Sequence, residues 1–301
     1  MNGGGAVRSA VVINPVKVDV GQWRRTIRAA LSEAGWPEPL WYETTVSDPG
    51  RGLVRRAIEA GAELVFVCGG DGTVRSCVGA LAGTDVTMAV LPGGTGNLLA
   101  ANLGVSTDPA EAVRTGIHGR RRCIDVGAVG DECFTVMAGM GLDAHMLSAT
   151  PEPVKARLGW AAYLFGGIRH LWGRPMRVAI QIDDDPPLLR RARSVLVANV
   201  GELQGGIRLV ADAVPDDGRL DVAVLTPRTL GHWLALGFSL LRRRRRVPGL
   251  EVLPARRVTI TSDRPQSREL DGDVIADHHR LRVSIRPTAL WLNVPAPPPG
   301  T

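Results

Sequence analysis

Two glycine-rich turns, each following a short apolar run, constrain the fold of this chain more than any other feature. The first run, Leu64–Cys68, leads into Gly69–Thr73, and the second, Met88–Leu91, leads into Pro92–Asn97. Runs this short, apolar on both faces, are typical of buried strands in a parallel sheet. Each turn is followed by a short segment predicted to be helical, near residues 74–81 and near residues 98–102, so the sequence predicts two strand–turn–helix units in tandem.

Tandem turns of this kind favour phosphate binding, although ordinary connections between helices and strands also use glycine. Glycine allows positive φ and brings backbone amides close to a ligand, and the helix N-termini add positive potential. A carboxylate at Asp71 would repel phosphate unless a cation lay between them, which indicates Mg²⁺ with a nucleotide. Thr73 is expected to cap its helix or to reach a phosphate oxygen. We expect the amides of Gly70, Gly72 and Gly94 to face phosphates. The predicted nucleotide-binding residues in the two turns are Gly69, Gly70, Asp71, Gly72, Thr73, Gly93, Gly94, Thr95 and Asn97.

The common phosphate-binding templates are missing from both turns. Neither turn fits the G-x-x-x-x-G-K-[ST] pattern, and neither fits G-x-G-x-x-G with a suitably placed acidic residue. No lysine follows either turn, so the charge on a bound phosphate would be balanced by amides, a metal ion and arginines.

The order of the predicted elements indicates the fold class. Residues 10–13 predict a first buried strand, 23–34 a helix that ends at Gly35, and 53–60 a further helix after a short second strand. Strands alternating with helices predict a doubly wound, three-layer α/β domain that binds its ligand at the carboxyl ends of the strands. We place this domain at residues 1–124.

From Ile124 onward the composition changes to short β-rich segments separated by turn residues. These segments are residues 124–129, 133–138, 178–182, 194–200, 220–225, 258–261 and 281–285. This pattern predicts a mostly antiparallel β domain over residues 125–285. Asp183–Asp185 is most simply a hairpin turn, because one local cluster rarely completes a metal shell. Residues 295–301 are proline-rich and are expected to be disordered.

Composition narrows the range of partners and the compartment. The net charge of +6 and the pI near 9.7 favour an anionic partner. Aromatic residues make up only 4% of the chain and show no basic–aromatic pattern, so a nucleic acid is the least favoured partner. Four cysteines without C-x-x-C spacing suit a reducing cytoplasm, and no signal peptide or membrane span is expected.

Three segments could meet a membrane surface. Residues 158–172 carry large apolar side chains four apart, which fits a core helix or an acyl-chain contact. Residues 229–241 run into Arg242–Arg246, which fits a peripheral helix on anionic headgroups or a solvated basic loop. Arg120–Arg122 is a solvated face or a lipid contact. We therefore expect a cytoplasmic protein that associates peripherally with the anionic inner face of the cell membrane.

A pair of carboxylates late in the chain, Asp271 and Asp273, alternates around a glycine. In an extended segment both side chains would point the same way. Near the terminal phosphate of a nucleotide, such a pair suits one residue as general base and the other as its orienter or as a metal ligand.

Gly69–Thr73 together with Pro92–Asn97 resembles the diacylglycerol kinase catalytic domain family, which includes bacterial lipid kinases, sphingosine kinases and ceramide kinases. NAD kinases share the first motif only. Residues 139–144 resemble a Gly-x-Gly-Phe-Asp-Ala motif with Leu142 in place of Phe, and residues 199–206 and 212–222 resemble later motifs, so the resemblance covers nearly the whole chain. It implies an NAD kinase-like nucleotide domain, a β-sandwich-like lipid-kinase domain, and a last strand at 286–294 that returns to the first domain.

The resemblance also implies further ligands. Asn14 stands where the family has Asn-Pro-x-Ser-Gly, and Thr44 would meet the nucleotide, although a turn or capping threonine fits the residues equally well. Asp217 with the main-chain carbonyls of Val214 and Arg219 would hold a structural Mg²⁺. From the residues alone, Asp217 is more simply part of an Asp-Gly turn.

At the late acidic pair, the family pattern is Leu-Asp-Gly-Glu with the glutamate as the expected base. Asp273 stands at the glutamate's position and is shorter by one C–C bond of about 1.5 Å. The resemblance therefore implies Asp273 as the base with Asp271 beside it, and the substitution makes an inactive protein a real alternative.

Together these observations predict a lipid kinase that binds ATP and Mg²⁺ in a cleft between its two domains. Its expected acceptor is the free hydroxyl of diacylglycerol, which would give phosphatidate. The alternatives are a kinase of another acceptor, such as a sphingoid base, phosphatidylglycerol or NAD, and an inactive nucleotide- or lipid-binding regulator. The acyl chains and the oligomeric state, including a homodimer, stay open.

Overall fold

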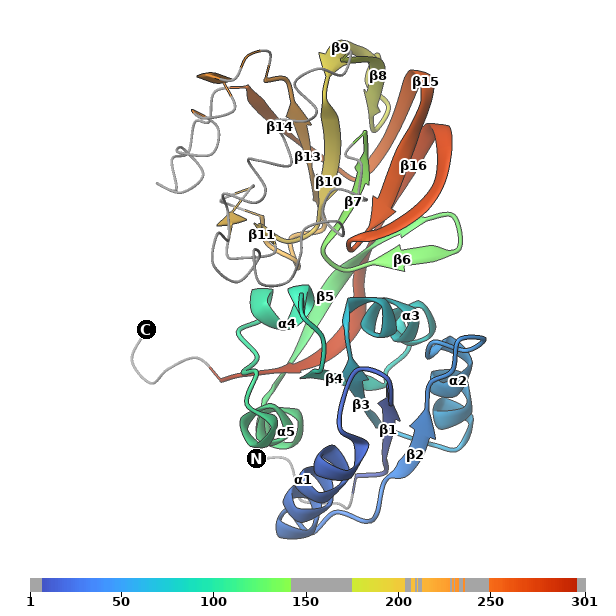
Figure 1. Ribbon diagram of the computed structural model, residues 1–301, viewed down its shortest axis with the longest axis vertical. Coiled ribbons are helices and arrows are strands. Elements are labelled where there is room, and N and C mark those ends of the chain that lie inside the picture. The colour runs from blue at the N-terminus through green and yellow to red at the C-terminus, as the bar shows by residue number, and fades with distance from the viewer. Residues whose placement is uncertain are drawn as a thin grey trace. The chain divides into compact units, whose positions relative to one another are not determined.

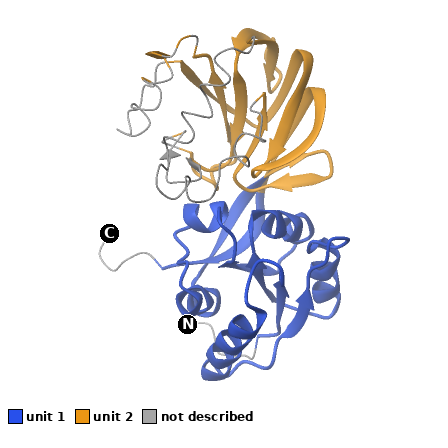
Figure 2. Ribbon diagram, viewed as in Figure 1, with its two compact units in different colours: residues 1–126, 288–301 blue, residues 127–287 orange. Residues whose placement is uncertain are grey.

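The computed structural model describes residues 7–141, 175–203, 207–208, 210, 213–227, 229, 231–232, 235 and 249–296. The chain divides into two compact units, which we call unit 1 (residues 1–126 and 288–301) and unit 2 (residues 127–287), as Figure 2 shows. The predictions for residues 158–172, for Arg242–Arg246 and for the tail beyond Ala296 lie outside the described residues.

Unit 1 is built on a parallel sheet with the strand order β4-β3-β1-β2. The strands are β1 (Ser9–Ile13), β2 (Leu40–Glu43), β3 (Leu64–Gly69) and β4 (Thr87–Pro92). β1, β3 and β4 are buried at every position, as expected for strands covered on both faces. On the other edge of β4, Trp291 and Leu292 of β16 (Asp273–Val294) pair in parallel with Thr87 and Met88.

Helices cover both faces of this sheet. They are α1 (Val20–Glu33), α2 (Arg51–Glu59), α3 (Asp71–Leu81), α4 (Leu98–Asn102) and α5 (Pro109–His118). α1 packs with α5 on one face and α2 with α3 on the other (Figure 1). The predicted doubly wound, three-layer α/β architecture is thereby confirmed.

Local sequence signals explain where the longer helices begin. Asp19 and Asp108 are the N-caps of α1 and α5, and each accepts a hydrogen bond from a backbone amide three residues on, at 2.9 Å. α1 then buries Trp23, Ile27 and Leu31, spaced four residues apart, so one stripe of the helix faces the sheet.

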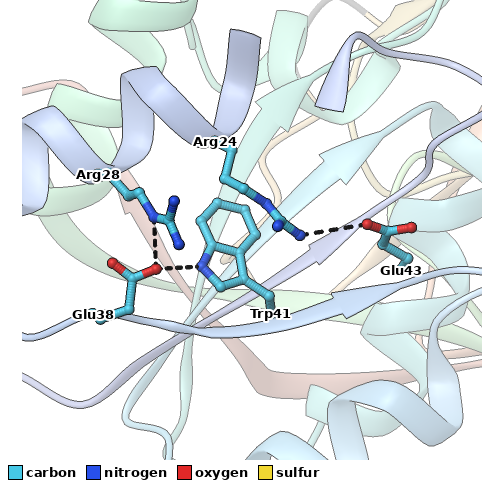
Figure 3. Close-up of polar contacts among 5 residues, drawn as sticks. All are labelled: Arg24, Arg28, Glu38, Trp41 and Glu43. Atoms are coloured by element: carbon cyan, nitrogen blue, oxygen red, sulfur yellow. Dashed lines mark hydrogen bonds and ion pairs between the residues drawn. The ribbon is translucent and has the colours of Figure 1, made fainter. Parts of the chain in front are cut away.

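A group of polar contacts ties α1 to the edge strand β2 (Figure 3). The guanidinium of Arg24 lies 4.8 Å from the centre of the Trp41 ring and that of Arg28 lies 5.9 Å from it. Glu38 accepts from Trp41 Nε1 at 2.9 Å and from Arg28 Nε at 2.7 Å. The hydrogen bond from Trp41 is the main cause that lowers the pKa of Glu38. Arg24 also reaches Glu43.

Arg121, part of the predicted solvated or lipid-binding face Arg120–Arg122, is exposed and also makes specific contacts within unit 1. Its guanidinium lies 3.9 Å from the centre of the Trp291 ring and donates to Thr87 Oγ1 at 3.0 Å and to Asp85 O at 2.7 Å. Arg121 therefore fastens β5 (Arg120–Val129) to β4 and to the end of β16.

Unit 2 is almost entirely antiparallel. Its further strands are β6 (Glu132–Phe134), β7 (Met137–Met140), β8 (Met176–Ile182), β9 (Leu188–Ala192), β10 (Ser194–Ala198), β11 (Glu202–Leu203), β12 (Ile207–Arg208), β13 (Leu220–Leu225), β14 (Leu250–Ala255) and β15 (Arg257–Leu270). The order β14-β13-β10-β7-β15 forms one run of strands, and β8 and β9 extend from the other part of β15.

β15 is shared between two parts of the β structure. Val258–Ser262 pair with β8, whereas Arg268–Leu270 pair with β7, and register shifts against β16 occur between Thr261 and Arg268. Strands that change sheets through bulges are a feature of β-sandwiches. Both parts contribute to one apolar core, including Ala138 and Val197 from one part and Ile180 and Ile260 from the other. The predicted sandwich-like domain is confirmed.

Predicted strands in unit 2 differ from the observed ones in detail. The segment predicted at 133–138 is divided between β6 and β7, and β9 and β14 were not predicted because their residues are only partly buried. The Asp183–Asp185 turn follows β8, where Asp183 accepts from the amides of Arg256 and Arg257.

Among the described residues, no helix is long and apolar enough to span a membrane.

Candidate active site

The parallel register of unit 1 brings four predicted ligand segments to one edge of the sheet. Ile13, at the carboxyl end of β1, pairs with Glu43 of β2 and with Cys68 of β3, and Gly69 pairs with Pro92 of β4. The residues that follow these strand ends therefore gather at that edge, as in other open α/β sheets that bind ligands there. They are Asn14, Thr44, Gly70 and Gly93.

The two glycine-rich turns pack backbone against backbone. Gly93 N donates to Gly69 O at 3.0 Å. A Cβ atom built on Gly94 would lie only 2.6 Å from Gly70 Cα, so a residue with a side chain does not fit without a backbone shift. Asp71 Oδ1 accepts from Leu98 N at 2.7 Å, so the carboxylate of the first turn holds the start of the helix after the second. The turns form one structural group.

The N-terminus of α3 is the strongest candidate phosphate site. Gly70 is its N-cap and offers no side chain to the first-turn amides, which have no acceptor within the helix. These amides and the helix dipole favour an anion. Behind them, Thr73 is buried and its Oγ1 accepts from Asn14 Nδ2 at 3.1 Å. Asn14 and Thr73 thus brace the loop after β1 against α3.

One expected phosphate contact is wrong. The amide of Gly94 donates to Asn97 Oδ1 at 2.9 Å, and Asn97 Nδ2 donates back to Gly94 O at 2.7 Å. Asn97 adopts a left-handed conformation, with φ of 48°, which turns its side chain onto the loop. Asn97 therefore shapes the second turn from within, and the Gly94 amide is not offered to a ligand.

The remaining predicted nucleotide ligands differ in exposure. Thr44 is buried, and its amide donates to Ile13 O at 2.9 Å, which extends the pairing of β1 with β2. Thr95 is exposed at the tip of the second turn. Burial raises the pKa of the Cys68 and Cys77 thiols, so neither acts as a nucleophile in this unit.

Replacing Gly94 with alanine is expected to weaken ATP binding about 5- to 150-fold. The added methyl meets the Gly70 backbone at 2.6 Å, and such overpacking costs about 1–3 kcal/mol. Calorimetric titration of ATP·Mg into the purified variant measures the effect. Gly231→Ala is the matched control, because a Cβ there approaches no atom of the described residues closer than 3.8 Å. Equal ATP affinity for Gly94→Ala and wild type would show that the contact of the turns is not needed.

In unit 2, the expectation that Asp271 and Asp273 lie on one extended segment is wrong. Leu270 pairs with Asp273, which leaves Asp271 and Gly272 as the two central residues of a tight hairpin. Their φ angles are 48° and 88°, the combination of a type I′ turn, for which Asp-Gly is a favoured sequence. The two aspartates therefore occupy different structural positions.

Asp271 is an internal anchor of this hairpin. Its Oδ1 accepts from Val136 N at 2.8 Å and Met137 N at 2.9 Å, and its Oδ2 accepts from Thr135 N at 2.9 Å and Thr135 Oγ1 at 3.2 Å. The residue is 5% exposed. The carboxylate thus fixes the hairpin tip to the segment before β7, and its predicted role as orienter of the base stays a prediction.

Asp273 is the first residue of β16 and is exposed. The anchor at Asp271 sets its position two residues away. Sequence reasoning missed the anchor's partners, because Thr135 lies 136 positions before Asp271 and belongs to none of the motifs described above. It also missed Asn199, whose Nδ2 donates to Thr135 O at 3.0 Å.

The predicted structural Mg²⁺ site contains a tight turn. Asp217 Oδ1 accepts from Arg219 N at 2.9 Å and Gly218 has a φ of 74°, as in the Asp-Gly turn favoured by the residues alone. Val214 is 44% exposed. In the described part of the chain, no three His, Cys, Asp or Glu residues cluster to hold a metal. A carboxylate with two carbonyls is a donor set that suits Mg²⁺, and the role of Val214, Asp217 and Arg219 stays a prediction.

Comparison with known proteins gives the family. Residues 8–129 match the model of the diacylglycerol kinase catalytic domain, and residues 136–294 match that of the YegS C-terminal NAD kinase beta sandwich-like domain. A "Probable lipid kinase YegS-like" of Pseudomonas putida is 31% identical over 97% of both chains. A protein of that name from Pseudomonas aeruginosa is 35% identical over 91% of this chain and 90% of its own.

Solved structures agree on the fold. The crystal structure of a diacylglycerol kinase from Bacillus anthracis superposes with a TM-score of 0.76 at 23% identity and covers 95% of this chain and 96% of its own. An NAD kinase from Archaeoglobus fulgidus, in complex with ATP, superposes with a TM-score of 0.53 at 11% identity over 95% and 93% of the two chains. The chain belongs to the family of YegS-like lipid kinases, which join a diacylglycerol kinase catalytic domain to a YegS C-terminal domain.

Proposed function

We propose that this protein is an ATP-dependent kinase whose acceptor is the free hydroxyl of diacylglycerol, so that its product is phosphatidate. The observation that carries the proposal is the pair of interlocked glycine-rich turns at the carboxyl edge of the sheet in unit 1. Membership of the lipid kinase family supports a lipid acceptor. Diacylglycerol is the finer assignment and rests on the name of the matched catalytic domain.

The substrate nucleotide enters as ATP·Mg. The first-turn amides of α3 bind its phosphates, and Asp71 is the residue that we expect to face a metal ion bound to them. The Asn14–Thr73 bond keeps the loops in place. Phosphoryl transfer requires little covalent chemistry from a protein, so positioning and charge neutralisation account for most of the rate enhancement.

Asp273 is the proposed general base. Its carboxylate takes the proton of the lipid hydroxyl as the hydroxyl oxygen forms a bond to the γ-phosphorus, and the bond from that phosphorus to the bridging oxygen breaks to release ADP. Asp273 is exposed, as a group that meets an incoming substrate should be. Asp271 serves the reaction as a positioning residue through its hydrogen bonds to residues 135–137.

The membrane is the proposed meeting place of enzyme and acceptor. A net charge of +6 favours an anionic lipid surface. We propose peripheral association with the inner face of the cell membrane.

A panel of acceptors tests the function. Purified protein with radiolabelled ATP·Mg should transfer label to diacylglycerol in mixed micelles at a rate at least tenfold above that with sphingosine, phosphatidylglycerol or NAD. Label that appears only in one of the other acceptors would replace the diacylglycerol assignment by that acceptor. Tight binding of ATP·Mg with no transfer to any acceptor would favour the inactive regulator.

A further inference from the structure

Glu269, on β15 two residues before the anchor Asp271, is a buried acidic residue that the mechanism proposed above does not use. It is 1% exposed, and neither carboxyl oxygen has a hydrogen-bond partner among the residues that the structure describes. Burial raises its pKa to about 7, and the nearby Asp271 charge adds to the shift. A buried carboxyl without hydrogen-bond partners lowers the stability of the folded protein, so a functional role would explain why it is present.

The surroundings of Glu269 form a cross-strand row that is otherwise apolar. Successive strand pairings align Val274 with Glu269, Glu269 with Gly139, Gly139 with Leu196, Leu196 with Ala223, and Ala223 with Val252. This row lies on the face opposite the sandwich core, since the alternate residues Leu270, Ala138, Val197 and Val222 belong to that core. Glu269 is the one polar residue of the row.

Gly139 makes room for the carboxyl. A Cβ built on Gly139 would lie 2.7 Å from Glu269 Oε1 and 2.9 Å from Leu196 Cδ2. The side chain of Glu269 therefore lies over the Gly139 backbone. A side chain at position 139 would occupy the same space. The row reaches the surface at Val274, which is 42% exposed and follows Asp273 directly in the chain.

We propose that Glu269 is a lipid-binding residue whose protonated carboxyl donates a hydrogen bond to an oxygen of a neutral acceptor lipid. The proposal rests on the proposed function and names a contact that would select the acceptor. An uncharged carboxyl suits the hydroxyl and ester oxygens of an acylglycerol. A sphingoid base, which carries an ammonium group, would call for the ionised form.

The test combines lipid binding with stability in the full-length protein. Calorimetric titration with dioctanoylglycerol should show affinity three- to tenfold weaker for Glu269→Leu, because one hydrogen bond is lost. Glu269→Gln should remain within twofold of wild type, because an amide also donates. ATP affinity should stay unchanged in both. Glu251→Gln, the same change at a half-buried glutamate paired with Arg190, is the matched control.

Denaturant unfolding separates a binding role from a structural one. Both Glu269 variants should be more stable than wild type at pH 8, where the wild-type carboxyl is buried and ionised. The raised pKa of Glu269 also means that wild-type stability falls as the pH rises from about 4.5 to about 7, and Glu269→Gln should lack that decline.

Several results would overturn the proposal. The first is an affinity of Glu269→Leu for dioctanoylglycerol equal to that of wild type, and the second is lower stability in both variants. The third is binding of sphingosine that Glu269→Gln abolishes, which would assign to Glu269 an ion pair with the ammonium group instead. Titration with dioctanoylglycerol needs no turnover, so the lipid affinities of the Glu269 variants can be interpreted even if the kinase assay shows no activity. The two proposals can therefore fail separately.

Discussion

Asp273→Asn should lower kcat for lipid phosphorylation by about 10²- to 10⁴-fold, the range that a positioned general base contributes. Asparagine keeps the size of the side chain and cannot take the hydroxyl proton. The ATP affinity and the free energy of unfolding should match wild type, because Asp273 is exposed and the hairpin is held by Asp271. Initial rates with the acceptor that wild type phosphorylates best measure the effect.

Two further variants sharpen this result. Asp277→Asn removes an exposed carboxylate from the same strand and should leave kcat within twofold of wild type. Asp273→Glu extends the carboxylate by about 1.5 Å and creates the Leu-Asp-Gly-Glu pattern, so it should retain activity. Full activity in Asp273→Asn would show that another group accepts the proton.

Asp271→Ala should destabilise unit 2 by about 3–5 kcal/mol, because several buried donors lose their acceptor and each unsatisfied buried donor costs about 1–3 kcal/mol. The substitution leaves the amides of residues 135, 136 and 137 and the Thr135 hydroxyl without their acceptor. It also places alanine at a φ of 48°, which aspartate and asparagine tolerate better. Urea unfolding of the full chain, followed by circular dichroism, measures the loss.

Asp271→Asn isolates the hydrogen bonds from the backbone strain. It tolerates the same φ and keeps one acceptor oxygen, so its cost should be smaller, about 1–3 kcal/mol. Asp183→Ala is the matched control, since Asp183 also has a φ of 48° and also accepts from two amides, but in exposed surroundings. If Asp271→Ala lost no more stability than this control, the anchoring role would be wrong.

The sequence was sufficient for much of unit 1 because its signals are local. Short apolar runs, capping aspartates and glycine turns act within a few residues of one another, and the predicted helix at 98–102 matches α4 residue for residue. The amide of Gly94 was assigned wrongly for the same reason. Its partner, Asn97, lies within the motif, but only the left-handed conformation of Asn97 turns that side chain inward.

Unit 2 was less predictable, because its decisive contacts join distant parts of the chain. As a local pattern, Asp271-Gly272 is compatible with a strand or with a turn. The pairing of Leu270 with Asp273 shows that it forms a turn. The partners of Asp271 lie some 135 positions earlier. Glu269 gives no signal in the sequence either, because its burial and its lack of partners arise only when β7 pairs with β15 and β10 pairs with β7.

The parallel pairing of Trp291 with Thr87 has a consequence for how the chain is made. Unit 1 contains residues from both ends of the sequence, so a growing polypeptide carries β4 with one side unpaired until all of unit 2 has been synthesised. Bare strand edges promote association with other chains. During translation, unit 1 thus begins to fold before unit 2 has been made and is completed after it, when Trp291 reaches Arg121.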